Sequence, residues 1–305
     1  MATFLIAAGV GVVRAVTGED MQALHLLGRS EVRWYLLTAV AASSCWLLLG
    51  IQAWRYVLAA LGSQLNLFDG ARVCFAAIVG TYLPGPWFQA LAAVHVGRRI
   101  GVEPRRMVVA YLLVAVVNLL SAASVGLLAA PLVLQGHWAW LVVPVVLSCT
   151  VVWHPRGVIQ ATAWAARLLR REPVTQLVEP RALRLAMLCQ ICAWMVGGVH
   201  LWLLAVALGG PPLKTLSVAV GAYAFASAAA ALILVLPDGA GAKDLLIVGA
   251  LTVALPVPAA VVAAVASRAC VIVAELLVGA GLLLAWRIRR GRQVGRPAVP
   301  STVHT

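Results

Sequence analysis

The stretch Leu236-Pro237-Asp238-Gly239-Ala240-Gly241-Ala242-Lys243-Asp244 interrupts a long apolar segment with a proline, two glycines and three ionisable side chains. Residues 215–236 before it are almost wholly apolar, and residues 245–255 after it are apolar but too few to cross a bilayer. Backbone groups that Pro and Gly release from a helix have no water partner in lipid, so such a break survives only inside protein or beside a wet cavity. Because ionisable residues at this depth are costly, the stretch is predicted to be a functional site.

The composition indicates a polytopic α-helical membrane protein. Of the 305 residues, 63% are hydrophobic and 11% are charged, and the mean hydropathy of +0.98 is far above that of soluble domains. The net charge of +13 could suggest a nucleic-acid partner, but the basic residues lie mainly between the apolar segments and in the tail. This is the pattern of a membrane protein with its positive residues on one side, so no nucleic-acid partner is expected.

Six apolar segments are predicted to span the membrane, and two further segments are broken. The predicted spans are 4–13, 34–54, 107–134, 138–153, 185–208 and 259–286. The first is short, which is consistent with a start further upstream. It lacks a basic lead-in and a cleavage site, so a membrane helix is favoured over a signal peptide. One broken segment is interrupted at Leu83-Pro84-Gly85-Pro86, and the other at the opening stretch.

The order of these segments predicts an inverted repeat. Residues 1–134 and 138–286 each comprise two spans, a broken segment and a third span, and the second half begins on the opposite side from the first. Two halves with discontinuous helices are typical of transport folds whose site lies near the bilayer midplane. The spacing agrees, because Arg55 precedes Pro84 by as many positions as Leu208 precedes Pro237.

If both broken segments are re-entrant hairpins that enter from opposite faces, most of the 23 basic residues fall on one side. That side is expected to be cytoplasmic and to hold the C-terminus. We predict one all-α membrane domain over 1–290, followed by a disordered basic tail at 291–305. An amphipathic piece at 159–169 is expected to lie on the membrane surface.

Two stretches resemble the transmembrane domain of the lysylphosphatidylglycerol synthase and flippase-like family, which includes the membrane half of the multiple peptide resistance factor. The first runs from Gln52-Ala53-Trp54-Arg55 through Leu83-Pro84-Gly85 to Gly97-Arg98-Arg99-Ile100-Gly101-Val102. The second is the opening stretch, with Arg268 where a later helix of the family carries an arginine. The resemblance covers 1–290 and implies that the protein moves membrane lipids with charged or sugar head groups across the bacterial plasma membrane.

The first motif departs from the family pattern. Pro86 and Gln89 stand where the family usually has Arg and Glu, and Val114, Ala115 and Asn118 replace charged positions on the next helix. The second motif keeps an adjacent basic and acidic residue as Lys243 and Asp244. The charged groups are therefore predicted to be retained in the second half and largely neutralised in the first.

The candidate site lies at the start of a half helix near Gly241. Its N–H groups and positive dipole end suit a phosphate, and Gly239 and Gly241 allow close approach. Lys243 adds a point charge, and the planar guanidinium of Arg268 suits a bidentate grip on phosphate oxygens. Asp238 is expected to cap the half helix.

Two acidic residues, Asp244 and Glu275, are expected to hold Lys243 and Arg268 while the site is empty, or to bind an amino-bearing head group. Arg268 and Glu275 are seven positions apart and therefore share a helix face. The alternative is that these charges form a structural ion-pair cluster that stabilises a re-entrant loop.

From the first half, Tyr82, Pro84, Gly85, Trp87 and Gln89 are predicted to meet the second hairpin tip. Trp87 is either an interfacial anchor or a wall for an acyl or prenyl chain.

Several other residues are predicted to have no chemical role. The six cysteines lie inside apolar segments, and the spacing of Cys189 and Cys192 is read as packing rather than metal or redox chemistry. His95 and His200 have no second ligand at metal spacing, and Asn118 is expected to form an interhelical hydrogen bond. The sequence contains no recognisable catalytic triad, phosphate-binding loop or metal motif, so no enzyme activity, metal or cofactor is expected.

Three functions fit the sequence. The leading hypothesis is a flippase that moves an anionic or glycosylated lipid, phospholipid or polyprenyl-linked. The second is a secondary transporter of a small anion at the same site. The third is a membrane partner of a separate enzyme that modifies lipids or transfers sugars.

Overall fold

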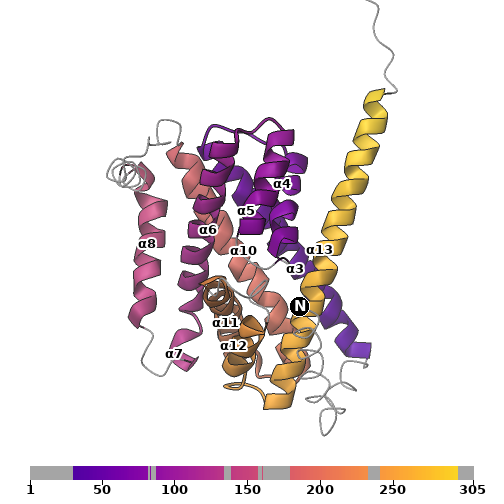
Figure 1. The fold of residues 1–305 in the computed structure, drawn as a ribbon. Coiled ribbons are helices and arrows are strands. Elements are labelled where there is room, and N and C mark those ends of the chain that lie inside the picture. The colour runs from indigo at the N-terminus through magenta and orange to yellow at the C-terminus, as the bar shows by residue number, and fades with distance from the viewer. Residues whose placement is uncertain are drawn as a thin grey trace, which may run out of the picture.

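The computed structural model describes residues 30–81, 83, 87–133, 139–156, 160, 179–232 and 241–294. Within these ranges the regular secondary structure is helical throughout, as predicted. The elements in Figure 1 are α3 (Ser30–Ala60), α4 (Leu67–Thr81), α5 (Trp87–Arg99), α6 (Pro104–Gly126), α7 (Ala130–Val133), η1 (Ala139–Leu141), α8 (Val142–Trp153), α10 (Pro180–Ala207), α11 (Pro212–Leu232), α12 (Ala242–Leu251) and α13 (Val257–Val294). The predicted helix at 4–13 and most of the predicted surface helix at 159–169 lie outside the described residues.

Five described helices are long and apolar enough to cross a membrane, namely α3, α6, α10, α11 and α13. A polytopic membrane protein is thereby confirmed, with two changes to the predicted spans. The segment predicted at 138–153 forms only the shorter helix α8. In contrast, α11, predicted as one arm of a broken segment, has the length of a full span. It begins earlier than predicted because Pro212 suits the first turn of a helix, where no N–H donor is needed.

The predicted span at 107–134 is not one helix, because α6 ends at Gly126 and a turn leads into α7. Close packing against α11 explains the difference. A Cβ atom on Gly221 of α11 would lie 2.4 Å from the backbone nitrogen of Ala129, and one on Gly126 would lie 3.0 Å from the Cβ of Phe225. The turn therefore rests directly on α11.

The two breaks occur where the sequence predicted them. Helix α4 ends at Thr81 and α5 begins at Trp87, while α11 ends at Leu232 and α12 begins at Ala242. The two helices of each pair pack against each other. In Figure 1 the α4–α5 pair lies in the upper half of the molecule and the α11–α12 pair in the lower half. Both halves thus follow the order long helix, broken pair, long helix; the inverted repeat and the re-entrant path stay predictions.

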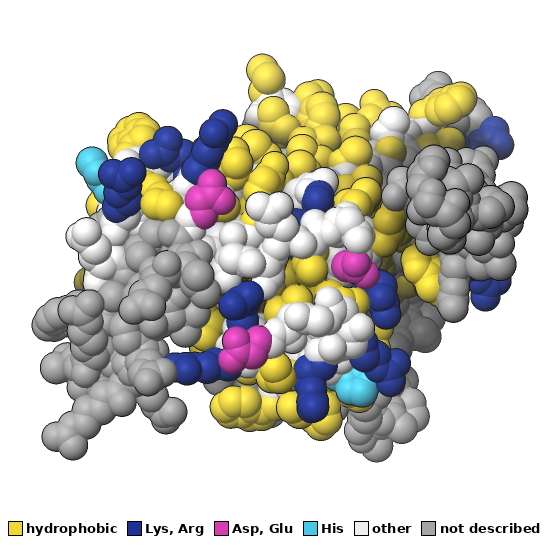
Figure 2. All heavy atoms as spheres, turned by 90° about the horizontal axis from the view of Figure 1, so that it is seen from above, with side chains coloured by type: hydrophobic (Ala, Val, Ile, Leu, Met, Phe, Trp, Pro, Cys, Tyr) yellow, Lys and Arg dark blue, Asp and Glu magenta, His cyan; other side chains and the backbone are white. Residues whose placement is uncertain are grey.

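Hydrogen bonds show which turns share an end of the bundle. Arg106 donates to the Ser63 hydroxyl at 2.9 Å, and the Glu179 N–H donates to the Ala60 carbonyl at 2.8 Å. These bonds join the turns after α3 and α5 to the start of α10, and Figure 2 shows Lys and Arg side chains spread over this upper face. At the other end, the Lys214 ammonium donates to the Val253 carbonyl at 2.8 Å.

Helix α10 is the centre of the bundle, because it packs against α3, α6, α8, α11 and α13. Its close approach to α11 depends on Gly198, where a Cβ atom would lie 2.4 Å from the Cα of Val220. Gln190 donates to Asn118 of α6 at 2.9 Å, which confirms the predicted interhelical hydrogen bond of Asn118. Helix α13 continues to Val294, so the first residues of the predicted tail are helical.

Candidate functional site

The half helix of the second hairpin begins as predicted, but with a different cap. Helix α12 starts at Ala242, and Gly241 occupies the cap position with a φ of 85°, a conformation that favours glycine. The Asp244 carboxylate accepts the Gly241 N–H at 3.4 Å. Gly241 therefore occupies the N-cap position. Asp238, the cap that the sequence predicts, lies outside the described residues together with Gly239.

An ion pair joins α12 to the last long helix. Arg268 Nη1 of α13 lies 2.8 Å from Asp244 Oδ2, and the two side chains are 36% and 31% exposed. The sequence predicts that Asp244 and Glu275 together hold Lys243 and Arg268, and the structure shows Asp244 on Arg268. About a third of each side chain is exposed, which leaves the pair accessible to a ligand. Glu275, two turns further along α13, is half-buried and lies close enough to Cys74 of α4 to interact with it electrostatically.

Lys243 contacts an aromatic ring. Its ammonium lies 4.4 Å from the ring centroid of Tyr223 on α11, a cation–π arrangement. The sequence predicts a carboxylate partner for Lys243 instead. The difference arises because Asp244 is turned toward Arg268. Lys243 precedes Asp244 by one position, and adjacent residues of a helix face different neighbours.

An aromatic cluster surrounds Tyr223. The ring centroids of Trp46 and Trp194 each lie 6.0 Å from that of Tyr223, and His200 packs edge-on against it at 4.7 Å. His200 is fully buried and its Nε2 lies 2.7 Å from the Ser267 hydroxyl. The sequence predicts no chemical role for His200, because no second histidine or carboxylate stands at ligand spacing; Ser267 and Tyr223 come to it from other helices.

The first hairpin is held together by neutral groups. Tyr111 of α6 donates to the Gln89 side chain at 3.2 Å, and a Cβ atom on Gly80 would lie 2.6 Å from the Cα of Gln89. Trp87 is 76% exposed on the outside of α5. Tyr82, Pro84 and Gly85 lie outside the described residues, and so does the predicted contact between the two hairpin tips.

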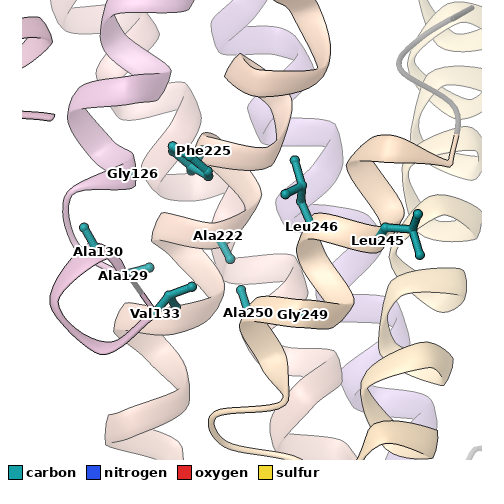
Figure 3. A pocket seen from close by; sticks show the side chains of 10 residues that line it. All are labelled: Gly126, Ala129, Ala130, Val133, Ala222, Phe225, Leu245, Leu246, Gly249 and Ala250. Carbon is teal, nitrogen blue, oxygen red and sulfur yellow. The ribbon is translucent and has the colours of Figure 1, made fainter. Parts of the chain in front are cut away.

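An apolar cavity of about 210 Å³ lies between α6 and α7 on one side and α11 and α12 on the other. Figure 3 shows its lining of small and aliphatic side chains together with Phe225. The lining residues are Gly126, Ala129, Ala130, Val133, Ala222, Phe225, Leu245, Leu246, Gly249 and Ala250. A space of this character suits hydrocarbon, because it offers an ion no polar partner. Its four α12 residues follow directly after Lys243 and Asp244 in the chain.

The described residues contain no group of three or more His, Cys, Asp or Glu side chains that could hold a metal ion.

A family model, described as the lysylphosphatidylglycerol synthase TM region, matches residues 1–279. The chain belongs to this family. Membership and the apolar helices together identify a multi-pass membrane protein with a lipid-related function. A search of curated proteins finds no match.

Proposed function

We propose that the protein is a flippase, which moves an anionic or glycosylated lipid across the bacterial plasma membrane with its C-terminus in the cytoplasm. The observation that carries the proposal is the half-exposed ion pair between Arg268 and Asp244 at the N-terminal end of α12. Lys243 adjoins this pair. Arg268 thus lies beside a helix N-terminus that also carries Lys243, within a largely apolar domain, and a phosphate prefers groups of this kind.

A phosphate at this site would compete with Asp244 for the guanidinium of Arg268. Because Asp244 also accepts the Gly241 N–H, the carboxylate keeps one partner when it releases the arginine. The empty site is then an ion pair, which avoids an isolated charge in the membrane, and the occupied site replaces that pair with a second one. Neither state requires covalent chemistry, and we propose that the protein acts without catalysis, metal or cofactor.

The hydrocarbon part of the lipid has a separate place to bind. The cavity beside Phe225 is lined by α12 residues that follow Asp244 within two turns. Gly249 keeps this space open, since a Cβ atom there would meet nothing within 4 Å. We propose that a segment of the acyl or prenyl chain occupies this cavity while the head group is bound near Arg268.

Reconstitution into vesicles tests the proposal. Vesicles would carry fluorescent phosphatidylglycerol or a fluorescent polyprenyl phosphate, and a membrane-impermeant quencher would report how much label reaches the outer leaflet. Wild-type protein is expected to speed the exchange, and Arg268→Ala to slow it by about thirtyfold, as expected for loss of a charged hydrogen-bonded partner worth about 2 kcal/mol.

Arg72→Ala is the matched control, because Arg72 forms a surface pair with Asp69 at 3.3 Å, away from the second hairpin. It is expected to transport at the wild-type rate. If wild-type vesicles exchange no faster than empty ones, or if Arg268→Ala matches the control, the flippase proposal is wrong. Uptake of a soluble anion instead of lipid would identify the small-anion transporter.

A second candidate is a non-transporting partner of a separate enzyme that modifies lipids or transfers sugars. The neutral first hairpin favours it, because only one of the two halves keeps charged groups near its break. Co-purification of such an enzyme with a protein that moves no lipid would support this function. Lipid movement by the isolated protein would exclude it.

A further inference from the structure

The buried imidazole of His200 lies at a junction of three helices. Its Nε2 is 2.7 Å from the Ser267 hydroxyl of α13, and its Nδ1 contacts the carbonyl oxygen of Gly197 on its own helix. Tyr223 of α11 packs edge-on against the ring at 4.7 Å. Histidine is the side chain that gains or loses a proton near neutral pH, so the interior of the bundle contains a group able to bind a proton.

The hydrogen bonds define how this group takes up a proton. The Gly197 carbonyl can only accept, so Nδ1 of His200 carries a hydrogen, and Nε2 of the neutral ring accepts from the Ser267 hydroxyl. When a second proton arrives, Nε2 becomes a donor. The serine hydroxyl, which can donate or accept, then turns to receive it. Both ring nitrogens keep a partner in both protonation states, so protonation leaves neither of them unsatisfied.

His200 is connected to the anion site through Tyr223. The Tyr223 ring contacts both groups: its centroid lies 4.7 Å from that of the imidazole and 4.4 Å from the Lys243 ammonium. The positive charge of Lys243 is close enough to act on the imidazole. A second connection runs along α13, where Ser267 directly precedes Arg268.

Lys243 is the charged group that acts on His200 among the described residues. Helix α3 places Trp46 beside Gly197 and Tyr223, and the fully buried Ser43 lies one turn before Trp46. On α13, the Cys270 thiol lies one turn beyond Ser267, and the Arg268 charge is directed to Asp244. Lys243 is thus the charge among the described groups whose state most affects His200.

We propose that His200 is a proton-binding site coupled to the anion site, so that the protein takes up a proton when an anionic head group binds Lys243 and Arg268. The inference rests on the proposed function. Two positive charges that both contact the Tyr223 ring oppose each other in a low-dielectric interior. An anion on Lys243 removes that opposition, and by linkage a proton on His200 raises the anion affinity by the same factor. A transmembrane proton gradient would then drive lipid movement.

Proton uptake on ligand binding tests this coupling. Purified protein in weakly buffered detergent would be titrated with dihexanoyl phosphatidylglycerol at a series of pH values at and below about 6.5, the ordinary histidine pKa, while a dye reports pH. The phosphodiester of this probe does not titrate in this range, so any proton bound comes to the protein. Wild type is expected to take up a measurable fraction of one proton per lipid, and His200→Gln none. His95→Gln, which changes an exposed histidine of α5, is expected to match wild type. Equal uptake by His200→Gln would overturn the proposal.

A second measurement separates this inference from the flippase proposal. Histidine-labelled NMR spectra recorded over a range of pH give the His200 signal as the difference between wild type and His200→Gln. Its titration midpoint is expected to rise in Lys243→Met, because the opposing charge is gone. An unchanged midpoint would refute the coupling even if lipid binds. A raised midpoint with no lipid bound would leave the coupling in place and count against the flippase.

Discussion

The two broken helix pairs have the same helix order and different chemistry. In the first, a tyrosine-to-glutamine hydrogen bond and a glycine contact hold α5 to its neighbours. In the second, an ion pair joins α12 to α13 and a lysine lies over an aromatic ring. The same helix order is thus compatible with neutral contacts in the first pair and charged contacts in the second. The difference suggests that the first pair mainly provides structure and that the second provides the ligand site.

The strongest test of this comparison asks whether the two pairs are turned in opposite directions. In a background without native cysteines, Gln64→Cys and Glu103→Cys are expected to react with a membrane-impermeant reagent from one side, and Thr252→Cys only from the other. The reason is that the first two positions adjoin the turns joined by Arg106 and Ser63, whereas Thr252 adjoins Val253, which accepts from Lys214. Labelling of all three from one side would break the inverted arrangement.

The second test compares the two pairs in transport. Lys243→Gln is expected to slow lipid exchange about tenfold, because it removes a point charge that assists phosphate binding, an effect of about 1.4 kcal/mol. Gln89→Leu removes only a neutral hydrogen bond and is expected to change the rate less than about twofold. Exchange rates in vesicles at equal protein content would decide it. Equal losses in both variants would mean that the first pair also contacts the ligand.

The third test compares two glycines by thermal unfolding in detergent. Gly80→Ala is expected to destabilise the protein by about 2 kcal/mol, because its Cβ atom would lie 2.6 Å from the backbone of Gln89. Gly249→Leu should leave stability within about 0.5 kcal/mol, since the space is open. It should nonetheless slow lipid exchange by filling the cavity beside Phe225. A stable Gly249→Leu variant with full activity would show that the lipid chain does not bind in this cavity.

The smallest expected effect concerns Asp244. Asp244→Asn keeps an oxygen for the Gly241 N–H but loses the charge that competes with phosphate for Arg268. Binding of dihexanoyl phosphatidylglycerol, measured by calorimetry, is expected to tighten about threefold, or about 0.7 kcal/mol. Weaker binding would indicate that the carboxylate positions the arginine for its ligand.

Much of the fold could be predicted from the sequence. Continuous apolar segments specify membrane helices because lipid tolerates no unsatisfied backbone, and Pro84-Gly85 and Pro237 mark the breaks because proline and glycine interrupt helices. The charged residues of the site were recognisable for the same reason, since a charge in such a segment is costly. The sequence also predicted that Asp244 and Glu275 hold Lys243 and Arg268, but not which acid pairs with which base; the structure pairs Asp244 with Arg268.

Contacts between helices far apart in the sequence could not be predicted in this way. The turn after α6 packs on Gly221 of α11, and the partner of Lys243 is a ring on another helix. The surroundings of His200 could not be predicted from the sequence, because only helix packing brings Ser267 and Tyr223 into contact with it. The sequence by itself determined that the chain lies in a membrane, where its helices break and which charges it keeps. Only the tertiary structure decided which neighbours those charges meet, because side-chain contacts follow from how helices pack rather than from hydropathy.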